Sequence, residues 1–194
     1  MAFLSPKTLT TDEQQALLRV TSEHPRDHLV ISLALGTGLR LSELVGLNVA
    51  DVFFPNGEPR LRITVRAEIA KRGRTGDVFL PDALVPKLRE FWRHKRACGE
   101  GIGPEAPLLC SQSRRRISRR RIQVVVRAWQ VRAGFGRLYP FHALRHTSVT
   151  NIYRASRDLF LAQRFARHAS PLTTVLYTHP SDDELRQGVR HLTC

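Results

Sequence analysis

Two histidines, an arginine and a tyrosine in the last third of the chain stand at spacings that suit chemistry on a phosphodiester. His142 and Arg145 are three residues apart, so a helix places them on one face. His168 follows 23 residues after Arg145, and Tyr177 follows nine residues after His168. A guanidinium binds phosphate with a fork of donors, a histidine donates or moves protons, and a tyrosine hydroxyl can attack to form a covalent intermediate. These residues predict phosphoryl transfer if the chain also supplies more cations and an acid for the leaving group.

The same side chains could instead bind a metal ion or pack in the core. His142 and His146 are four apart and could bind zinc, but Ala143 stands where zinc proteases need glutamate, and no carboxylate lies nearby in sequence. Tyr177 taken alone is better explained as a core aromatic residue. The chain has no nucleophile-elbow motif of a serine hydrolase and no glycine-rich nucleotide loop.

Arg40 is a second candidate cation, because it follows an apolar helix and a glycine turn and precedes a new helix. Ser42 is the expected N-cap of that new helix. Helix N-termini attract anions, so Arg40 stands where a phosphate could bind. A surface ion pair between Arg40 and Glu43 explains the same residue at least as well.

Lys71 opens a basic turn, KRGR, at the tip of a predicted sheet. The chain uses 27 Arg but only 4 Lys, so a lysine here is unusual. Arginine does not release a proton near neutral pH, whereas a lysine with a lowered pKa can, so a general acid would need lysine. A solvated hairpin residue is an equal alternative.

Hydrophobic periodicity predicts a mainly α-helical chain with a small three-stranded antiparallel β-sheet. The strands are expected at 52–54, 61–65 and 78–80. Capping residues and apolar stripes predict helices from residues 11 and 25, at 42–47 and 84–97, one that continues through 129, and others at 140–155, 158–168, 170–177 and 182–191.

The charge is strongly positive and unevenly distributed. The formal charge is +14 and the isoelectric point is near 11.2, which indicates a polyanionic partner. Residues 106–157 contain twelve Arg and no Asp or Glu, while the rest of the chain holds 19 basic and 17 acidic side chains. A generally arginine-rich composition explains the preference for Arg over Lys but not the missing acids. One contiguous segment therefore predicts a nucleic-acid-binding face.

Length and cysteine content favour one cytoplasmic domain. A chain of 194 residues can bury a proper core, and the Gly- and Pro-rich loop at 99–107 is expected to lie within that domain. Three cysteines without a close pair do not suggest a disulfide framework and fit a reducing cytosol. No apolar run approaches the roughly 20 residues of a membrane span, so no membrane partner is expected.

Taken together, ordered motifs make the chain resemble the tyrosine recombinase, or phage integrase, family. The motifs are TGLRLSELVGL around Arg40, AKRGRTGDVFLP around Lys71, HALRH, RHAS, and TTVLYTH with its PSDDELRQ continuation. The resemblance implies a mainly helical catalytic domain that cuts double-stranded DNA by tyrosine attack, leaving a 3′-phosphotyrosine link and a free 5′-hydroxyl. It also implies strand exchange through a Holliday junction in a tetramer, with no metal, ATP or other cofactor.

The resemblance implies a role for each matching residue. Tyr177 would be the nucleophile, and Lys71 would protonate the leaving 5′-oxygen. His142 would assist proton transfer at the tyrosine. Arg40 and Arg145 would hold the non-bridging oxygens of the phosphate, and His168 would add a donor, which together offset charge in the transition state. Glu43 would position Arg40.

Further basic residues are expected to contact DNA phosphates, which set register without reading bases. They are Arg72 and Arg74 in the basic turn and Arg114, Arg115, Arg116, Arg119, Arg120 and Arg121 in the acid-free segment. The carboxy-terminal helix at 182–191 is expected to dock on a neighbouring subunit of a homo-tetramer, with packing on its own domain as an equal alternative.

Two positions depart from the pattern of the family. Arg167 stands directly before the second histidine, where relatives usually have glycine, and Ser156 occupies a turn that glycine often fills. The substitution at Arg167 is expected to alter the end of its helix. Neither residue is expected to touch a catalytic side chain.

Most relatives also have an amino-terminal helical domain that closes a clamp on DNA. Residues 1–194 are expected to form the catalytic domain alone, as in the short fimbrial-switch type or in a fragment of a longer protein. A bacterial or phage origin and association with the nucleoid are expected. Two rival functions remain: a type IB topoisomerase that relaxes supercoils, and a non-catalytic DNA-binding regulator derived from a recombinase.

Overall fold

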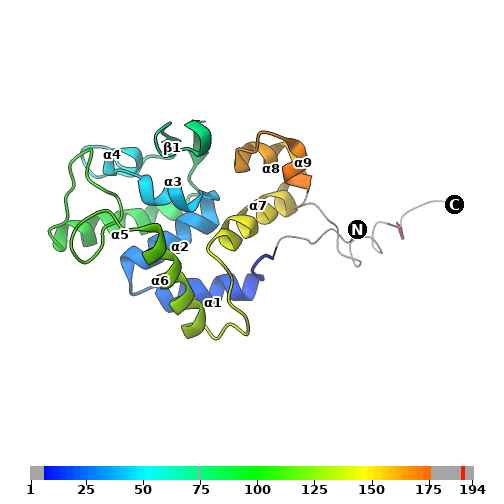
Figure 1. Cartoon of the computed structure of the whole chain (residues 1–194), viewed down its shortest axis with the longest axis horizontal. Coiled ribbons are helices and arrows are strands. Elements are labelled where there is room, and N and C mark those ends of the chain that lie inside the picture. Colours follow the sequence, from blue (N-terminus) through cyan, green and yellow to red (C-terminus); the bar gives the residue numbers. More distant parts are fainter. Residues whose placement is uncertain (1–6, 74, 176–188, 191–194) are drawn as a thin grey trace.

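The computed structural model describes residues 7–73, 75–175, 189 and 190, and within them the chain is mainly helical (Figure 1). The helices are α1 (Thr11–Thr21), α2 (Pro25–Thr37), α3 (Leu41–Gly46), α4 (Val49–Val52), α5 (Leu84–Ala97), α6 (Arg119–Arg132), α7 (His142–Ser156), α8 (Leu159–Ala166) and α9 (Pro171–Val175). The strands are β1 (Arg62–Val65) and β2 (Gly76–Phe79), joined through a 3₁₀ turn, η1 (Lys71–Gly73). A mainly helical fold with a small antiparallel sheet is therefore confirmed.

The sheet has two strands rather than three in the described part of the chain. Antiparallel β1 and β2 pair from Arg62 opposite Phe79 to Val65 opposite Gly76. The prediction of a strand at 52–54 was wrong, because Val52 ends α4 and Phe53 forms only an isolated bridge to Pro59. Proline has no N–H to extend a ladder of hydrogen bonds, so pairing stops there.

Helix α2 lies at the centre of the core. It packs against α1, α5, α6 and α7, and its apolar residues from Leu29 to Ala34 are buried, as its near-continuous apolar run predicts. A long-range polar contact also joins α2 to α6, because Trp129 Nε1 donates to Asp27 Oδ2 at 2.9 Å. No helix in the described ranges is both long and apolar enough to cross a membrane.

The α2–α3 connection presents Arg40 at a helix start. Gly38 adopts a left-handed conformation (φ 59°) and ends α2, and α3 begins three residues later. The helix therefore starts at Leu41, and Ser42 is not its N-cap as predicted. Arg40 takes that position, where its N–H donates to Glu43 Oε2 at 2.8 Å.

Helices α7, α8 and α9 follow one another with sharp turns, and α7 points toward the other two (Figure 1). The left-handed residue after α7 is Arg157 (φ 56°), whereas Ser156 is the last helical residue. Asp158 caps α8 by accepting from two backbone N–H groups, as its position predicts. Arg167 ends α8 in a second left-handed conformation (φ 51°), which sets the direction of the segment that carries His168. The predicted helix at 182–191 lies outside the described residues, apart from positions 189 and 190.

Candidate active site

Four of the predicted site residues border two adjoining hollows. Arg40, Lys71 and His168 line a cavity of about 420 Å³, together with Thr75, Arg167, Ala169 and Thr173. The second hollow shares Arg40 and Lys71 and adds His142, with Leu41, Ser42, Arg119 and Gln123 completing it. Residues from α3, η1, α7 and the end of α8 thus meet at one place, although more than 120 residues separate the first from the last.

Arg145 is buried and is not among the residues that line the two hollows. Its side chain is only 1% exposed, and its two terminal nitrogens donate to the carbonyls of Gly38 and Ala166. Those carbonyls lie two residues before Arg40 and His168. Arg145 therefore ties the segments that carry two site residues to each other.

Glu43 holds the Arg40 side chain in place. Its Oε1 accepts from Arg40 Nη1 at 2.8 Å, and the carboxylate is only 1% exposed. Burial raises the pKa of Glu43, but Arg167 and Arg40 outweigh that effect and lower it below its usual value. The ion pair between Arg40 and Glu43, which the sequence offered as an alternative explanation for Arg40, is present. It also orients the Arg40 guanidinium beside the cavity.

His168 is a neutral residue in this environment. Burial lowers its pKa to about 4, with further lowering from Arg145 and Arg40. Its Nδ1 lies 2.9 Å from the hydroxyl of Thr174, which is fully buried on α9. If that hydroxyl donates to Nδ1, then Nε2 carries the proton and can donate to a ligand in the cavity.

His142 lies against His146, which the sequence suggested only as a second possible zinc ligand. The rings of His142 and His146 lie edge to face with centroids 4.3 Å apart. Burial and then His142 lower the pKa of His146 to about 4, and burial, Arg145, Arg40 and Lys71 lower the pKa of His142. Within the described ranges, no third His, Cys, Asp or Glu gathers with them as a metal site would require. Both imidazoles are therefore neutral near pH 7 and able to accept a proton.

Arg167 is a site residue that sequence reasoning missed. It was noted only as a departure from glycine that would touch no catalytic side chain, but it contacts Glu43, the residue expected to position Arg40. Its Nη2 donates to Glu43 Oε2 at 2.5 Å, and its side chain lines the same cavity as Arg40 and His168. The signal that could have identified it in the sequence was an arginine directly before His168, at a position where relatives usually have glycine.

Residues 7–184 match the model of the phage integrase family. The chain belongs to this family. It is 31% identical to tyrosine recombinase XerC of Caldanaerobacter subterraneus subsp. tengcongensis over 189 residues, which are 95% of this chain and 50% of that protein. It is 30% identical to tyrosine recombinase XerA of Pyrococcus furiosus, a match that covers 95% of this chain and 61% of the relative. The chain thus spans about half the length of the curated relatives it matches.

Solved structures of the phage integrase family share the fold described above. A crystal structure of XerA recombinase superposes with a TM-score of 0.81 at 27% identity, covering 98% of this chain and 67% of that one. XerH site-specific recombinase, solved as a post-cleavage complex with palindromic difH substrate, gives a TM-score of 0.77 at 24% identity over 97% of this chain and 54% of XerH. The arrangement of α1 to α9 is therefore that of integrase-family proteins.

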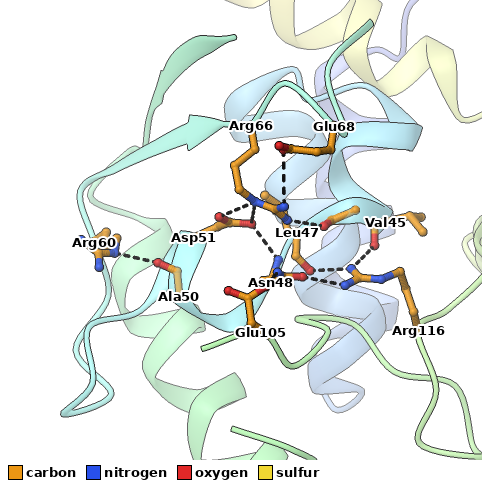
Figure 2. A network of polar contacts seen from close by, with 11 residues as sticks. Val45, Leu47, Asn48, Ala50, Asp51, Arg60, Arg66, Glu68, Glu105 and Arg116 are labelled. Carbon is orange, nitrogen blue, oxygen red and sulfur yellow. Dashed lines mark hydrogen bonds and ion pairs between the residues drawn. The ribbon is translucent and has the colours of Figure 1, made fainter. Parts of the chain in front are cut away.

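The predicted DNA-contact arginines of this integrase-family chain fall into different environments. Arg116 donates to the carbonyls of Val45 and Leu47 and to Asn48 Oδ1, at 2.9, 2.8 and 2.6 Å (Figure 2). Its observed contacts are therefore internal. All six arginines at 114–121 are exposed, and Arg119 also borders the second hollow. Among the described residues, no internal acceptor like those of Arg116 contacts the side chains of Arg114, Arg115, Arg120 and Arg121.

Three predicted residues of the integrase motifs fall outside the described part of the structure. Tyr177 and Arg74 lie outside the described residues, and so does the side chain of Arg72. The last residue of α9 is Val175, two residues before Tyr177. Helix α9 packs on α8, and its Thr174 contacts His168 in the cavity wall. The described segment that includes α9 ends two residues before Tyr177.

Proposed function

We propose that the chain is a site-specific tyrosine recombinase that cleaves and rejoins DNA without metal through a 3′-phosphotyrosine intermediate at Tyr177. The observation that carries the proposal is the shared cavity of Arg40, Lys71 and His168, whose flanking segments the buried Arg145 joins. These are the residue types that phosphoryl transfer uses for charge stabilisation and proton transfer, and they come from separate segments of the chain.

Arg40 and His168 would bind the non-bridging oxygens of the scissile phosphate. Glu43 fixes the Arg40 guanidinium, so little reorganisation is needed when charge develops in the transition state. Neutral His168 contributes one N–H donor. Arg145 adds buried positive charge and keeps the Arg40 and His168 segments together.

The protons balance across one step. The Tyr177 oxygen forms a bond to phosphorus as the bond from phosphorus to the 5′-oxygen breaks. His142, neutral near pH 7, would take the tyrosine proton, and Lys71 would give a proton to the leaving oxygen. The phosphotyrosine conserves the bond energy, so the free 5′-hydroxyl of a partner strand can reverse the step without a cofactor.

Double-stranded DNA is the proposed substrate. The acid-free segment at 106–157 supplies the positive face through exposed arginines such as Arg114, Arg115, Arg120 and Arg121, and Arg119 joins that face to the second hollow. Among the similar structures, XerH was solved with its difH substrate. Strand exchange would require a homo-tetramer, which the segment at 182–191 would help to join.

The test is a nicked suicide duplex that carries sequences flanking the gene. A covalent protein–DNA adduct on a denaturing gel is expected with the unaltered chain and should be absent with Tyr177→Phe. Conversion of the products to Holliday junctions distinguishes a recombinase from a topoisomerase, which would instead relax a supercoiled plasmid. No adduct on any flanking sequence would contradict the proposal and favour a DNA-binding regulator.

A further inference from the structure

Arg167 concentrates several unfavourable features in one residue. Its backbone is left-handed (φ 51°, ψ 46°), a conformation that suits glycine and strains a residue with a Cβ. Its side chain is only 12% exposed, so the guanidinium has lost most of its hydration. Its Nη1 is buried and donates to no acceptor among the described residues. Such costs gather at functional sites more than at purely structural ones.

The surroundings of Arg167 accommodate it closely. A Cβ at Gly76 would lie 2.7 Å from Arg167 Cδ, so the first residue of β2 leaves the room that the arginine stem needs. At the other end of the side chain, Glu43 accepts from both Arg167 and Arg40. The carboxylate thus holds two guanidinium groups side by side, both of which line the 420 Å³ cavity.

This arrangement leaves a net positive charge at the cavity. Arg40, Arg167 and Lys71 contribute three cationic groups, and Glu43 is the acid in contact with two of them. Burial, together with repulsion from Arg40, lowers the pKa of Arg167. An anion that enters the cavity would relieve this repulsion and provide further acceptors for the guanidinium groups.

We propose that Arg167 is a further phosphate-binding residue of this site, paired with Arg40 through Glu43 and acting on the scissile phosphodiester. The proposal deepens the proposed recombinase function and rests on it for the identity of the phosphate. The phosphate-binding property itself is a statement about the cavity, and it can be measured without DNA cleavage.

The chain contains a matched control for removing this arginine. Arg157 also ends a helix in a left-handed conformation (φ 56°), but it is exposed and does not line the cavity. Arg157→Gly and Arg167→Gly therefore remove the same charge and relieve the same backbone strain. Only Arg167→Gly changes the cavity.

The experiment titrates inorganic phosphate into the full chain and follows the His168 side-chain signals by NMR. Arg167→Gly is expected to weaken phosphate binding about tenfold, the effect of one charge-assisted hydrogen bond, and Arg157→Gly less than about twofold. Equal affinity in wild type and Arg167→Gly, or equal losses in both glycine variants, would overturn the proposal. Should Arg167→Gly not fold, Arg167→Lys keeps the charge without the fork, and a loss below about twofold in that variant would also overturn it.

Cleavage assays separate this proposal from the function it rests on. With the suicide duplex, Arg167→Gly should slow adduct formation at least about tenfold, and a neutral methylphosphonate at the cleaved position should remove most of that difference. A difference that persists on the neutral linkage would count against phosphate contact. If wild type forms no adduct but phosphate binding depends on Arg167, then the recombinase function fails and the Arg167 site stands.

Discussion

Glu43 binds Arg40 twice, accepting from its backbone N–H at Oε2 and from its Nη1 at Oε1, both at 2.8 Å. This pair fixes the start of α3 and the direction of the Arg40 guanidinium with one carboxylate. Because that carboxylate also holds Arg167, it is the point on which two cations of the cavity depend.

Glu43→Gln should lower both activity and stability. Removing a buried charge leaves two partly buried guanidinium groups without their anion, which is expected to cost about 3 kcal/mol in the free energy of unfolding. Adduct formation should slow at least about tenfold, because Arg40 is no longer held in position. Urea denaturation and the suicide-duplex assay measure the two effects.

Glu58→Gln is the control for this prediction. Glu58 pairs with Arg89 at 2.9 Å, but both side chains are more than half exposed. Its loss should change stability by less than about 1 kcal/mol and leave cleavage unchanged. Equal effects of the two substitutions would show that the burial of Glu43 does not matter.

Two half-buried histidines predict how stability depends on pH. His146 and His168 have folded-state pKa values of about 4, against 6.5 for an unperturbed histidine. Between these values the unfolded chain binds more protons than the folded one, so the free energy of unfolding falls as pH falls from about 6.5 to 4. Above about pH 6.5 both states are neutral at these groups and their contribution is constant.

Urea denaturation at several pH values tests this dependence, with His146→Gln as the variant that removes one of the two groups. The slope of the unfolding free energy between about pH 6.5 and 4 should be smaller in His146→Gln than in wild type. NMR titration of His168 should give a midpoint near pH 4. A midpoint near 6.5, the ordinary value, would mean that His168 is solvated and charged more readily than its surroundings indicate.

Lys71 is exposed at the first position of η1, on the wall of both hollows. If it protonates the leaving 5′-oxygen, Lys71→Ala should slow cleavage about 100-fold. A substrate with sulfur at the bridging 5′ position needs no acid, because a thiolate is a far better leaving group than an alkoxide. Lys71→Ala should cleave that substrate nearly as fast as wild type, whereas an equal defect on both substrates would assign Lys71 to binding.

Local signals predicted much of this fold. The helix expected from residue 11 begins at Thr11 behind a capping box of Thr10 and Glu13, α5 has the predicted bounds Leu84–Ala97, and the helix expected from 158 follows Asp158 as its cap. Each of these depends on residues within a few positions of one another. The error at 52–54 also has a local cause. The Asn48 N–H donates to the Asp51 side chain, and this capping box starts helix α4, which includes Val52.

The parts that could not be predicted depend on distant contacts. Glu43 and Arg167 are 124 positions apart, so their ion pair has no signature in sequence spacing. Arg116 lies in a run of arginines that resembles a phosphate-binding surface, yet its acceptors are about 70 positions upstream. A charged side chain does not reveal whether its partner is DNA or a carbonyl of its own chain.

Arg116 and Arg115 should therefore differ in what their loss changes. Arg116 hydrogen-bonds to the α3–α4 connection, where Arg66 and Asp51 also form an ion pair at 2.9 Å (Figure 2). Arg116→Ala removes the donor to the Val45 carbonyl and to Asn48 Oδ1, whereas the Leu47 carbonyl keeps its bond from the Leu108 N–H, and the loss should cost about 1 to 3 kcal/mol of stability. Arg115→Ala, an exposed neighbour, should leave stability unchanged and reduce the salt dependence of DNA binding by about one phosphate contact. Urea denaturation and binding titrations at several salt concentrations distinguish the two, and equal stabilities would contradict this structural role of Arg116.

Gly76 and Arg167 predict a non-additive pair. A methyl group at Gly76 would lie 2.7 Å from Arg167 Cδ, so Gly76→Ala must displace the arginine stem. Gly76→Ala alone should slow adduct formation, and in an Arg167→Gly background it should add almost nothing, because the group it displaces is already gone. The double-mutant cycle on cleavage rate measures this coupling, with melting temperatures to separate folding from function. Two independent, additive losses would show that Gly76 acts on β2 itself and not through Arg167.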